Sequence, residues 1–203
     1  LTVLQILNKN RQICGGIPAH APMTKEIRRR KMLQRFYPRR TAESAYVIDY
    51  EKLYREGYRG ILFDIDNTLV RHGANASKRA IALFDRLKRI GFQCCLISNN
   101  EEERVLRFNR DIGVNYIYNA HKPSGKNYIA ATKIMGTTIK NTIFVGDQLF
   151  TDVYGANRVG MMTYLVKPIH PKEEIQIVFK RKLERIVLHY YRKDLKSGKI
   201  RAD

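Results

Sequence analysis

Apolar runs alternate with amphipathic stretches along residues 60–166, and this alternation constrains the fold more than any other feature of the sequence. The apolar runs are 60–64, 92–97, 114–118, 141–145 and 161–166. Between them, apolar side chains recur at helical spacing in 77–90, 101–112, 124–135 and 151–159. A glycine follows each of these stretches, where a left-handed helix end is expected. Apolar strands separated by helices predict a parallel sheet with helices on both faces.

The length of 203 residues suits one domain with terminal extensions. We expect a single Rossmann-like α/β domain over residues 41–170, with a sheet of about five strands and a short helix at 49–56 before the first. Residues 1–40 form a basic N-terminal extension, within which 1–22 show no period and are not established as native, since the chain begins with Leu. Residues 171–203 are predicted to form a basic C-terminal helix and tail.

Basic residues outnumber acidic ones by 38 to 19, and the excess lies at the two ends. Residues 1–40 carry ten basic side chains and one acidic one, and residues 171–203 carry ten and five. Two basic ends predict a polyanionic partner: an anionic membrane, a nucleic acid or a phosphorylated substrate.

Both ends also contain apolar side chains that suit a membrane surface. Leu33, Phe36 and Tyr37 lie within a basic segment at 25–40, where Pro38 stops any helix. At 175–190, one helical stripe is expected to be apolar and suits either docking on the domain or an anionic lipid surface; it consists of Ile175, Phe179, Leu183, Ile186, Val187 and Tyr190. Basic clusters with aromatics also suit RNA, which we hold as the less favoured partner.

The cysteines and the uncharged segments bear on location. Cys14, Cys94 and Cys95 cannot form a disulfide framework, and the last two are expected to be buried in a reducing compartment. The longest run without a charge has 13 residues, short of the ~20 that a spanning helix needs. With no secretory signal visible, we expect a cytoplasmic protein, peripheral on the inner membrane face or on the matrix side of a mitochondrion.

Polar side chains follow the predicted strands and are expected to meet at one edge of the sheet, because ligands bind outside the carboxyl ends of parallel strands. Two acids at i and i+2 with a third from another strand suit Mg²⁺, while a lysine and a serine suit phosphoryl oxygens. A carboxylate held against a phosphorus atom can attack it, and a second acid can move the proton. The residues concerned are Asp64 and Asp66, Ser98 and Asn99, Lys122, and Asp147 and Asp152.

These residues form four motifs in order: DxDxT at 64–68, the strand-end Ser98, Lys122, and GDxxxxD at 146–152. The set resembles the haloacid dehalogenase (HAD) superfamily of phosphatases, over about residues 32–166. The segment that leads into the first motif resembles the YqeG-type class III branch, which is similar to the phosphatidylglycerophosphate phosphatases of bacteria and mitochondria.

The resemblance implies a phosphomonoesterase with an aspartyl-phosphate intermediate. By it, Asp64 is the nucleophile, and Asp66 is the general acid and base. Ser98 holds the phosphoryl group and Lys122 stabilises it.

The resemblance also implies a bound Mg²⁺. Asp64 and Asp147 are its carboxylate ligands, and Asp66 offers its main-chain carbonyl. Asp152 orients a metal-bound water or Lys122. Asn99 either bonds to phosphate or shapes a turn.

The spacing of the motifs leaves no room for a cap domain, because only 34 residues separate Asp64 from Ser98 and 24 separate Ser98 from Lys122. An open site suits substrates whose bulk stays outside. The leading expectation is hydrolysis of phosphatidylglycerophosphate at a membrane surface. The alternatives are a soluble phosphatase of nucleotides, sugar phosphates or phosphoproteins, and an RNA- or ribosome-associated basic protein with a vestigial site.

Overall fold

The computed structural model describes residues 25–170 and 175–200. Expectations for residues 1–22, and for the side chains of Ile175 and Phe179, lie outside the described residues. The chain divides into two compact units, Leu1–Met32 and Leu33–Asp203. The described part of the first unit belongs to helix α2 (Lys25–Gln34).

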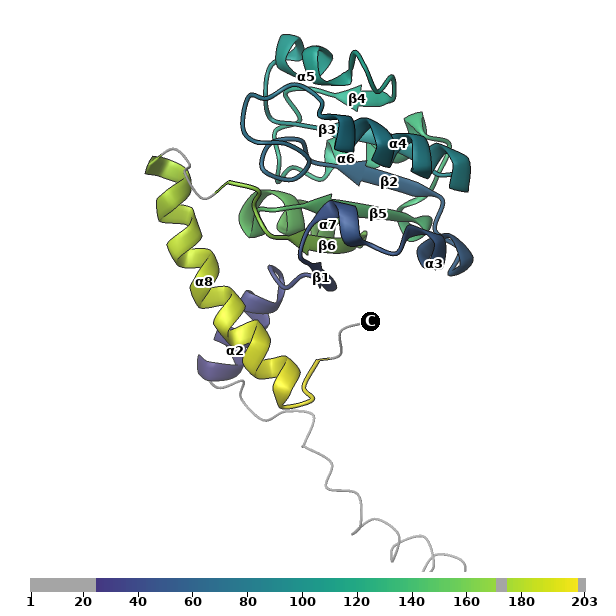
Figure 1. Ribbon diagram of the computed structural model, residues 1–203. Helices are drawn as coiled ribbons and strands as arrows, with labels where there is room; N and C mark the ends of the chain where they lie inside the picture. The colour runs from purple at the N-terminus through teal and green to yellow at the C-terminus, as the bar shows by residue number, and fades with distance from the viewer. Residues whose placement is uncertain (1–24, 171–174, 201–203) are drawn as a thin grey trace, which may run out of the picture. The chain divides into compact units, whose positions relative to one another are not determined.

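Six parallel strands form one sheet in the order β1-β6-β5-β2-β3-β4. The five apolar runs form five of these strands, and the sixth, β1, was not predicted (Figure 1). The strands are β1 (Arg40–Ala42), β2 (Gly60–Phe63), β3 (Gln93–Ile97), β4 (Asn115–Ile117), β5 (Thr142–Gly146) and β6 (Met162–Val166). The chain leaves β2 toward β3 on one side and returns to β5 on the other, so a topological switch point lies between β2 and β5.

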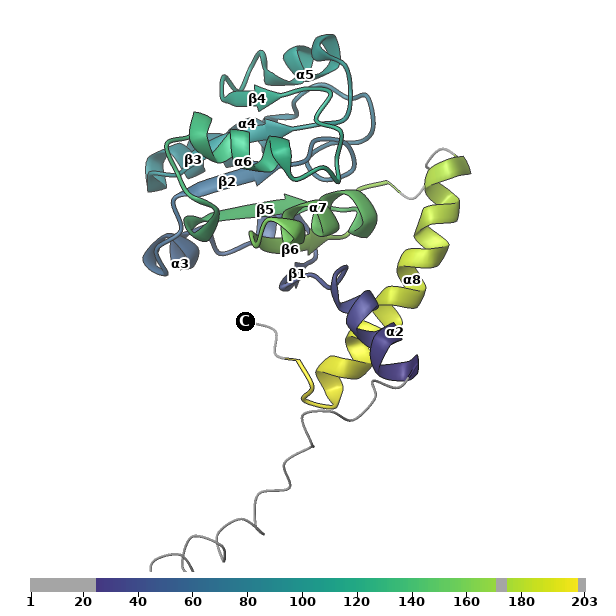
Figure 2. The ribbon, with the colours of Figure 1, turned by 180° about the vertical axis from the view of Figure 1, so that it is seen from behind.

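Helices cover both faces of the sheet, as the alternation predicted. On one face, α3 (Tyr50–Arg55), α4 (Lys78–Ile90) and α5 (Glu102–Asn109) pack on side chains such as Ile61 and Phe63. On the other, α6 (Lys126–Ile134) and α7 (Tyr154–Arg158) pack on side chains such as Leu62 and Phe144. Figure 1 shows α4 in front of the strands, and Figure 2 shows α6 and α7 from the opposite side.

The helix ends follow the local sequence. The Ser77 hydroxyl accepts a hydrogen bond from the Ala80 N–H and starts α4, and Asp49 caps α3 in the same way. Positive φ angles at all four predicted glycines confirm the expected left-handed conformation; these are Gly91, Gly113, Gly136 and Gly160. Short 3₁₀ turns at Ala45–Val47 and Ile139–Asn141 precede α3 and β5. The predicted helix at 151–159 begins earlier, as a π turn, η3 (Leu149–Val153).

The N-terminal segment differs from its prediction. Arg40 belongs to β1, which pairs with β6, so the domain includes residues assigned to the extension. Tyr37 is buried and its hydroxyl donates to Asp194, 3.1 Å away, while Phe36 packs on the rings of Phe150 and Tyr154. Because these rings fill an apolar cluster of the domain, Phe36 and Tyr37 are not available for insertion into a membrane.

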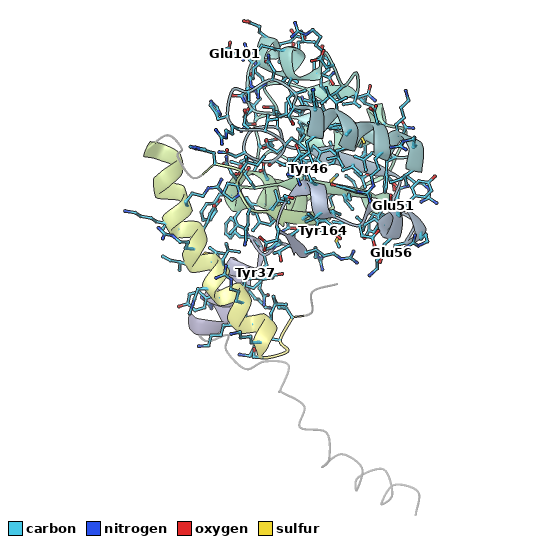
Figure 3. The ribbon with its side chains drawn as sticks, viewed as in Figure 1. Tyr37, Tyr46, Glu51, Glu56, Glu101 and Tyr164 are labelled. Carbon is cyan, nitrogen blue, oxygen red and sulfur yellow. The ribbon has the colours of Figure 1, made fainter. Side chains whose placement is uncertain are left out.

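The C-terminal helix α8 (Ile175–Lys196) also departs from the predicted stripe. Its buried face carries Val187 and Tyr191 together with the buried acids Glu184 and Asp194. The ring of Tyr37 packs against that of Tyr191, and Figure 3 shows Tyr37 beside α8. Two members of the expected stripe point away from this face, since Leu183 and Ile186 are 43% and 51% exposed. The helix therefore docks on the domain by a mixed face and leaves apolar side chains outside.

Cys94 and Cys95 are buried free cysteines in β3, as expected. Burial raises the pKa of each thiol to about 12, which leaves both thiols protonated and unreactive near neutral pH. Among the described residues, no helix is long and apolar enough to cross a bilayer.

Candidate active site

Three carboxylates meet at the carboxyl ends of β2 and β5. Asp64 follows β2, and its main-chain N–H donates to the carbonyl of Val145 in β5, 3.0 Å away. Asp147 follows β5, and Asp152 lies five residues on, in η3. One oxygen from each carboxylate lies within 4.8 Å of the others, and all three side chains are buried. The topology thus concentrates negative charge at the switch point of the sheet.

The ammonium group of Lys122 lies within this carboxylate cluster and partly neutralises its charge. Its Nζ lies 2.6 Å from Asp64 Oδ1 and 2.7 Å from Asp152 Oδ1, and only 4% of its side chain is exposed. Asn99 holds Lys122 in place: Asn99 Oδ1 accepts from the Lys122 N–H at 2.7 Å, and Asn99 Nδ2 donates to the Lys122 carbonyl at 3.2 Å. Both polar atoms of the Asn99 side chain thus serve a neighbouring backbone, which favours the turn-shaping interpretation of this residue.

Asp152 links the lysine to the end of β5. Its second oxygen accepts hydrogen bonds from the main-chain N–H groups of Asp147 and Gln148, at 3.2 and 3.1 Å. Gly146 makes this approach possible, since a Cβ there would lie 2.5 Å from Asp152 Oδ2. In the GDxxxxD motif, the first position must be glycine because a side chain there would clash with Asp152. The last position is an acid because it accepts the two main-chain hydrogen bonds.

Thr68 joins the two strands. Its hydroxyl lies 3.1 Å from Asp64 Oδ2 and 3.2 Å from Asp147 Oδ1, so it can donate to either carboxylate. The last residue of DxDxT thereby fixes the relative orientation of the first acid and of Asp147.

Helix α8 reaches the same carboxylates. The Arg181 guanidinium forms an ion pair with Asp147 Oδ2, and its Nη1 donates to the Asp147 carbonyl at 2.6 Å. Glu184 pairs with Arg181 at 2.9 Å and accepts from the Leu149 N–H at 2.7 Å. The two residues lie about one helical turn apart, so one face of α8 closes the acid cluster.

The electrostatics of the cluster follow from burial. Burial raises the pKa of Asp64 to about 6, against the opposing attraction of Lys122. Burial and the charge of Asp64 likewise raise the pKa of Asp147, which Arg181 opposes. Burial by itself lowers the pKa of Lys122, but Asp152 and Asp64 outweigh it and hold that pKa above its ordinary value. Burial therefore disfavours the ionised forms of Asp64 and Asp147 in the free protein.

The side chain of Asp66 lies apart from the cluster. Its oxygens accept from the Gly73 N–H at 2.8 Å, from Asn100 Nδ2 at 2.6 Å and from Arg104 Nη2 at 2.8 Å. The same Arg104 side chain has two further nitrogens, Nε and Nη1, that are buried without a hydrogen-bond partner. Asp66 is thus held at the rim of the site by α5 and by the loop that follows β2.

Ser98 directly follows β3, the strand that pairs with β2, and its hydroxyl accepts from the Asn100 N–H at 3.1 Å. It is 2% exposed. The structure therefore brings Lys122 into contact with Asp64 and Asp152, with Asp147 in the same carboxylate cluster. Ser98 lies at the end of the neighbouring strand, and Asp66 lies at the rim of the site.

The donor set suits a divalent cation. Three buried carboxylates offer hard oxygen atoms within 4.8 Å of one another, which is the ligand type that Mg²⁺ and similar ions prefer. A divalent cation would also stabilise the ionised form of Asp64, which burial disfavours.

Sequence reasoning missed Arg181, Glu184 and Arg104 as neighbours of the site. Arg181 was placed only outside the expected apolar stripe of α8, and nothing in the local sequence links it to a residue 34 positions away. Arg104 lies in a helix that was predicted from the spacing of its apolar residues alone. Only the tertiary fold brings the Arg104 side chain to Asp66.

Comparisons with known proteins agree with this geometry. A family model described as HAD-hydrolase-like matches residues 119–175. The chain is 38% identical over 159 residues to the "Probable phosphatase YqeG" of Bacillus subtilis (strain 168), covering 77% of this chain and 92% of that one.

Two further relatives carry a more specific name. "Phosphatidylglycerophosphate phosphatase 1, chloroplastic/mitochondrial" of Arabidopsis thaliana is 30% identical over 74% of this chain. "Phosphatidylglycerophosphate phosphatase 1, chloroplastic" of Chlamydomonas reinhardtii is 28% identical over 68%. The chain spans 46% and 55% of their lengths. The chain belongs to the HAD superfamily of phosphatases, in its YqeG-type branch.

Proposed function

We propose that this phosphatase uses Mg²⁺ and an aspartyl-phosphate at Asp64 to hydrolyse phosphatidylglycerophosphate at the surface of an anionic membrane. The observation that carries the proposal is the buried contact of Asp64 with Lys122, beside Asp147 at the switch point of the sheet. The names of the plant and algal relatives support the choice of lipid.

In the first step, an oxygen of Asp64 attacks the phosphorus and forms an acyl-phosphate bond, while the bond from phosphorus to the glycerol oxygen breaks. The leaving oxygen takes a proton from Asp66. In the second step, Asp66 takes a proton from water, which attacks the phosphorus and releases phosphate and the Asp64 carboxylate. Lys122 and the Ser98 hydroxyl hold the phosphoryl oxygens in both steps.

Asp66 must turn toward Asp64 for this role, since Asn100 and Arg104 hold it at the rim in the free protein. The carboxylates of Asp64 and Asp147 and the main-chain carbonyl of Asp66 would hold the Mg²⁺. When bound, the ion would offset negative charge on the phosphoryl oxygens and on the carboxylates.

Contact with the membrane is proposed through α8. Leu183 and Ile186 are exposed, and Lys182 and Arg185 are exposed beside them. Apolar side chains flanked by cations suit the interface of an anionic bilayer, where each nearby cation contributes ~1 kcal/mol. The same helix contacts Asp147 through Arg181, so a membrane bound by α8 would lie close to the site.

The test is release of phosphate from phosphatidylglycerophosphate in vesicles, with and without Mg²⁺, compared with glyceraldehyde 3-phosphate in solution. We expect Mg²⁺-dependent release from the lipid and none by Asp64→Asn. Hydrolysis of the soluble ester alone would refute the lipid substrate and favour a soluble phosphatase. Inactivity on both, with tight RNA binding, would refute the enzyme and favour the vestigial site.

A further inference from the structure

A groove of about 1000 Å³ runs between α8 and the side of the sheet formed by the edge strand β1 and its neighbour β6. Asp147 lines its inner end, so the groove begins at one of the carboxylates of the active site. The volume lies at the upper end of the ~300–1000 Å³ of typical ligand sites. Apart from Asp147, none of the described residues that line the groove has a proposed catalytic or metal-binding role.

The lining of the groove is amphiphilic. Leu165 and Val166 of β6, and Leu188, Tyr191 and Leu195 of α8, give it an apolar wall. Along α8, the groove is also lined by Arg181, Arg185 and Arg192, which recur at spacings of four and seven residues and so share one face of the helix.

The acids in the lining already have partners. Arg181 pairs with Asp147 and Glu184, and Lys167 lies 2.6 Å from Glu43. Among the residues that the structure describes, Arg185 and Arg192 have no ion pair and are exposed. The charge that the groove offers to a ligand is therefore positive, next to an apolar wall.

We propose that this groove binds the part of an anionic phospholipid that is not hydrolysed, with Arg185 and Arg192 at the phosphodiester and the apolar wall at the glycerol backbone and first acyl carbons. Arg185 lies one turn of helix beyond Arg181, or about 6 Å, which is comparable with the glycerol that separates the two phosphates of the substrate. In this protein α8 would thus set substrate choice in the absence of a cap.

The groove fits such a lipid better than the other polyanions. A sugar phosphate or a nucleotide has no acyl chain that would pack against the leucine and valine side chains beside the cations. Single-stranded RNA is held by several aromatic faces on which successive bases stack, whereas Tyr191 is the single aromatic side chain among the described residues that line the groove. The exposed Leu183 and Ile186 on another face of α8 would place the helix, and hence the groove, at the membrane surface.

This inference rests on the proposed function, but its first test needs no catalysis. Dihexanoyl phosphatidylglycerol has the phosphodiester and lacks the hydrolysable phosphate, and it is a monomer in solution at low concentration. Calorimetric titration of the full chain should show saturable binding of this lipid and weaker binding of dihexanoyl phosphatidylcholine. Arg185→Glu with Arg192→Glu should weaken the binding by about tenfold or more, because two charge-assisted contacts become repulsive.

The matched control is Lys133→Glu with Lys140→Glu, which changes the net charge equally at two exposed positions outside the groove. It should bind the lipid as the unmodified chain does. Equal weakening by both pairs would show general attraction and overturn the proposal, as would the absence of saturable binding. Circular dichroism and urea unfolding of each variant establish that it is folded.

The second measurement is selectivity between substrates. The ratio of kcat/KM for phosphatidylglycerophosphate to that for p-nitrophenyl phosphate should fall about tenfold in the arginine pair and stay constant in the lysine pair. If the Arg185→Glu, Arg192→Glu variant still hydrolysed the lipid with an unchanged ratio of kcat/KM values, the groove would not be the lipid site. The proposed function would not be affected by that result. Binding of dihexanoyl phosphatidylglycerol without hydrolysis of phosphatidylglycerophosphate would overturn the proposed function and leave the groove as a lipid site.

Discussion

Replacing Asp64, the proposed nucleophile, by its neutral isostere in Asp64→Asn should abolish activity and yet stabilise the protein in the absence of divalent cations. The reason is the burial of Asp64, which raises its pKa from 3.8 to about 6 although Lys122 opposes the shift. A raised pKa means that ionisation of Asp64 costs the folded state more than the unfolded state. Asparagine keeps the shape and the bond from Lys122 Nζ, and it never ionises.

The magnitude and the sign follow from linkage. A shift of about two pKa units corresponds to about 3 kcal/mol at 1.36 kcal/mol per unit. Above the folded pKa of about 6 the wild type bears this whole penalty, so Asp64→Asn should be more stable by up to about 3 kcal/mol. As pH falls from about 6 to 3.8, Asp64 becomes protonated in the folded state and the difference should vanish.

The assay is urea unfolding of both proteins in a chelator, across a pH series. Asp85→Asn is the control, since Asp85 is exposed on α4 and should show no such gain at any pH. With millimolar Mg²⁺ the advantage of Asp64→Asn should shrink, because the ion binds the wild-type carboxylate. A variant less stable than the wild type above pH 6 in the chelator would refute the reasoning, since attraction to Lys122 would then exceed the cost of burial.

Three other changes test the site. Gly146→Ala puts a Cβ 2.5 Å from Asp152 Oδ2, so urea unfolding should show a loss of ~1–3 kcal/mol, and normal stability would contradict the close approach. Asn99→Ala removes two hydrogen bonds to the Lys122 backbone and should lower kcat more than it raises KM in steady-state assays; an unchanged kcat would show that Lys122 needs no such support. Mg²⁺ at about 100 times its Kd should stabilise the wild type by ~2.7 kcal/mol in thermal unfolding and stabilise Asp147→Asn less, and equal shifts would place the ion elsewhere.

The sequence predicted the parts of the fold that depend on local sequence patterns. Apolar runs such as 60–64 and 141–145 form strands whose two faces are both covered by helices, so apolar and polar residues do not alternate along them. Gly91 and Gly136 end helices because only glycine adopts a positive φ there without strain. The convergence of Asp64, Asp147 and Lys122 followed from strand direction alone.

The parts that were missed depend on contacts between distant segments. The edge strand β1 has three residues, and it forms a strand only because its backbone pairs in parallel with β6. On α8 the buried acids Glu184 and Asp194 lie outside the expected stripe, and their hydrogen-bond partners, Leu149 and Tyr37, lie elsewhere in the chain. A hydrophobic stripe cannot identify such a face, because the burial is stabilised by hydrogen bonds rather than by apolar area.

The acid cluster places stability and catalysis in opposition. A carboxylate on the surface would ionise near its ordinary pKa and cost the fold little, but water would solvate it and screen its attraction to Lys122. At the switch point Asp64 is buried, so its contact with Lys122 is strong and its orientation is fixed by Thr68. The same burial raises its pKa to about 6, so the free protein approaches a neutral, non-nucleophilic Asp64 as pH falls. A divalent cation would relieve this conflict without moving the carboxylate, since it would stabilise the ionised form in place. The burial that orients Asp64 is thus also a physical reason for the proposed cation.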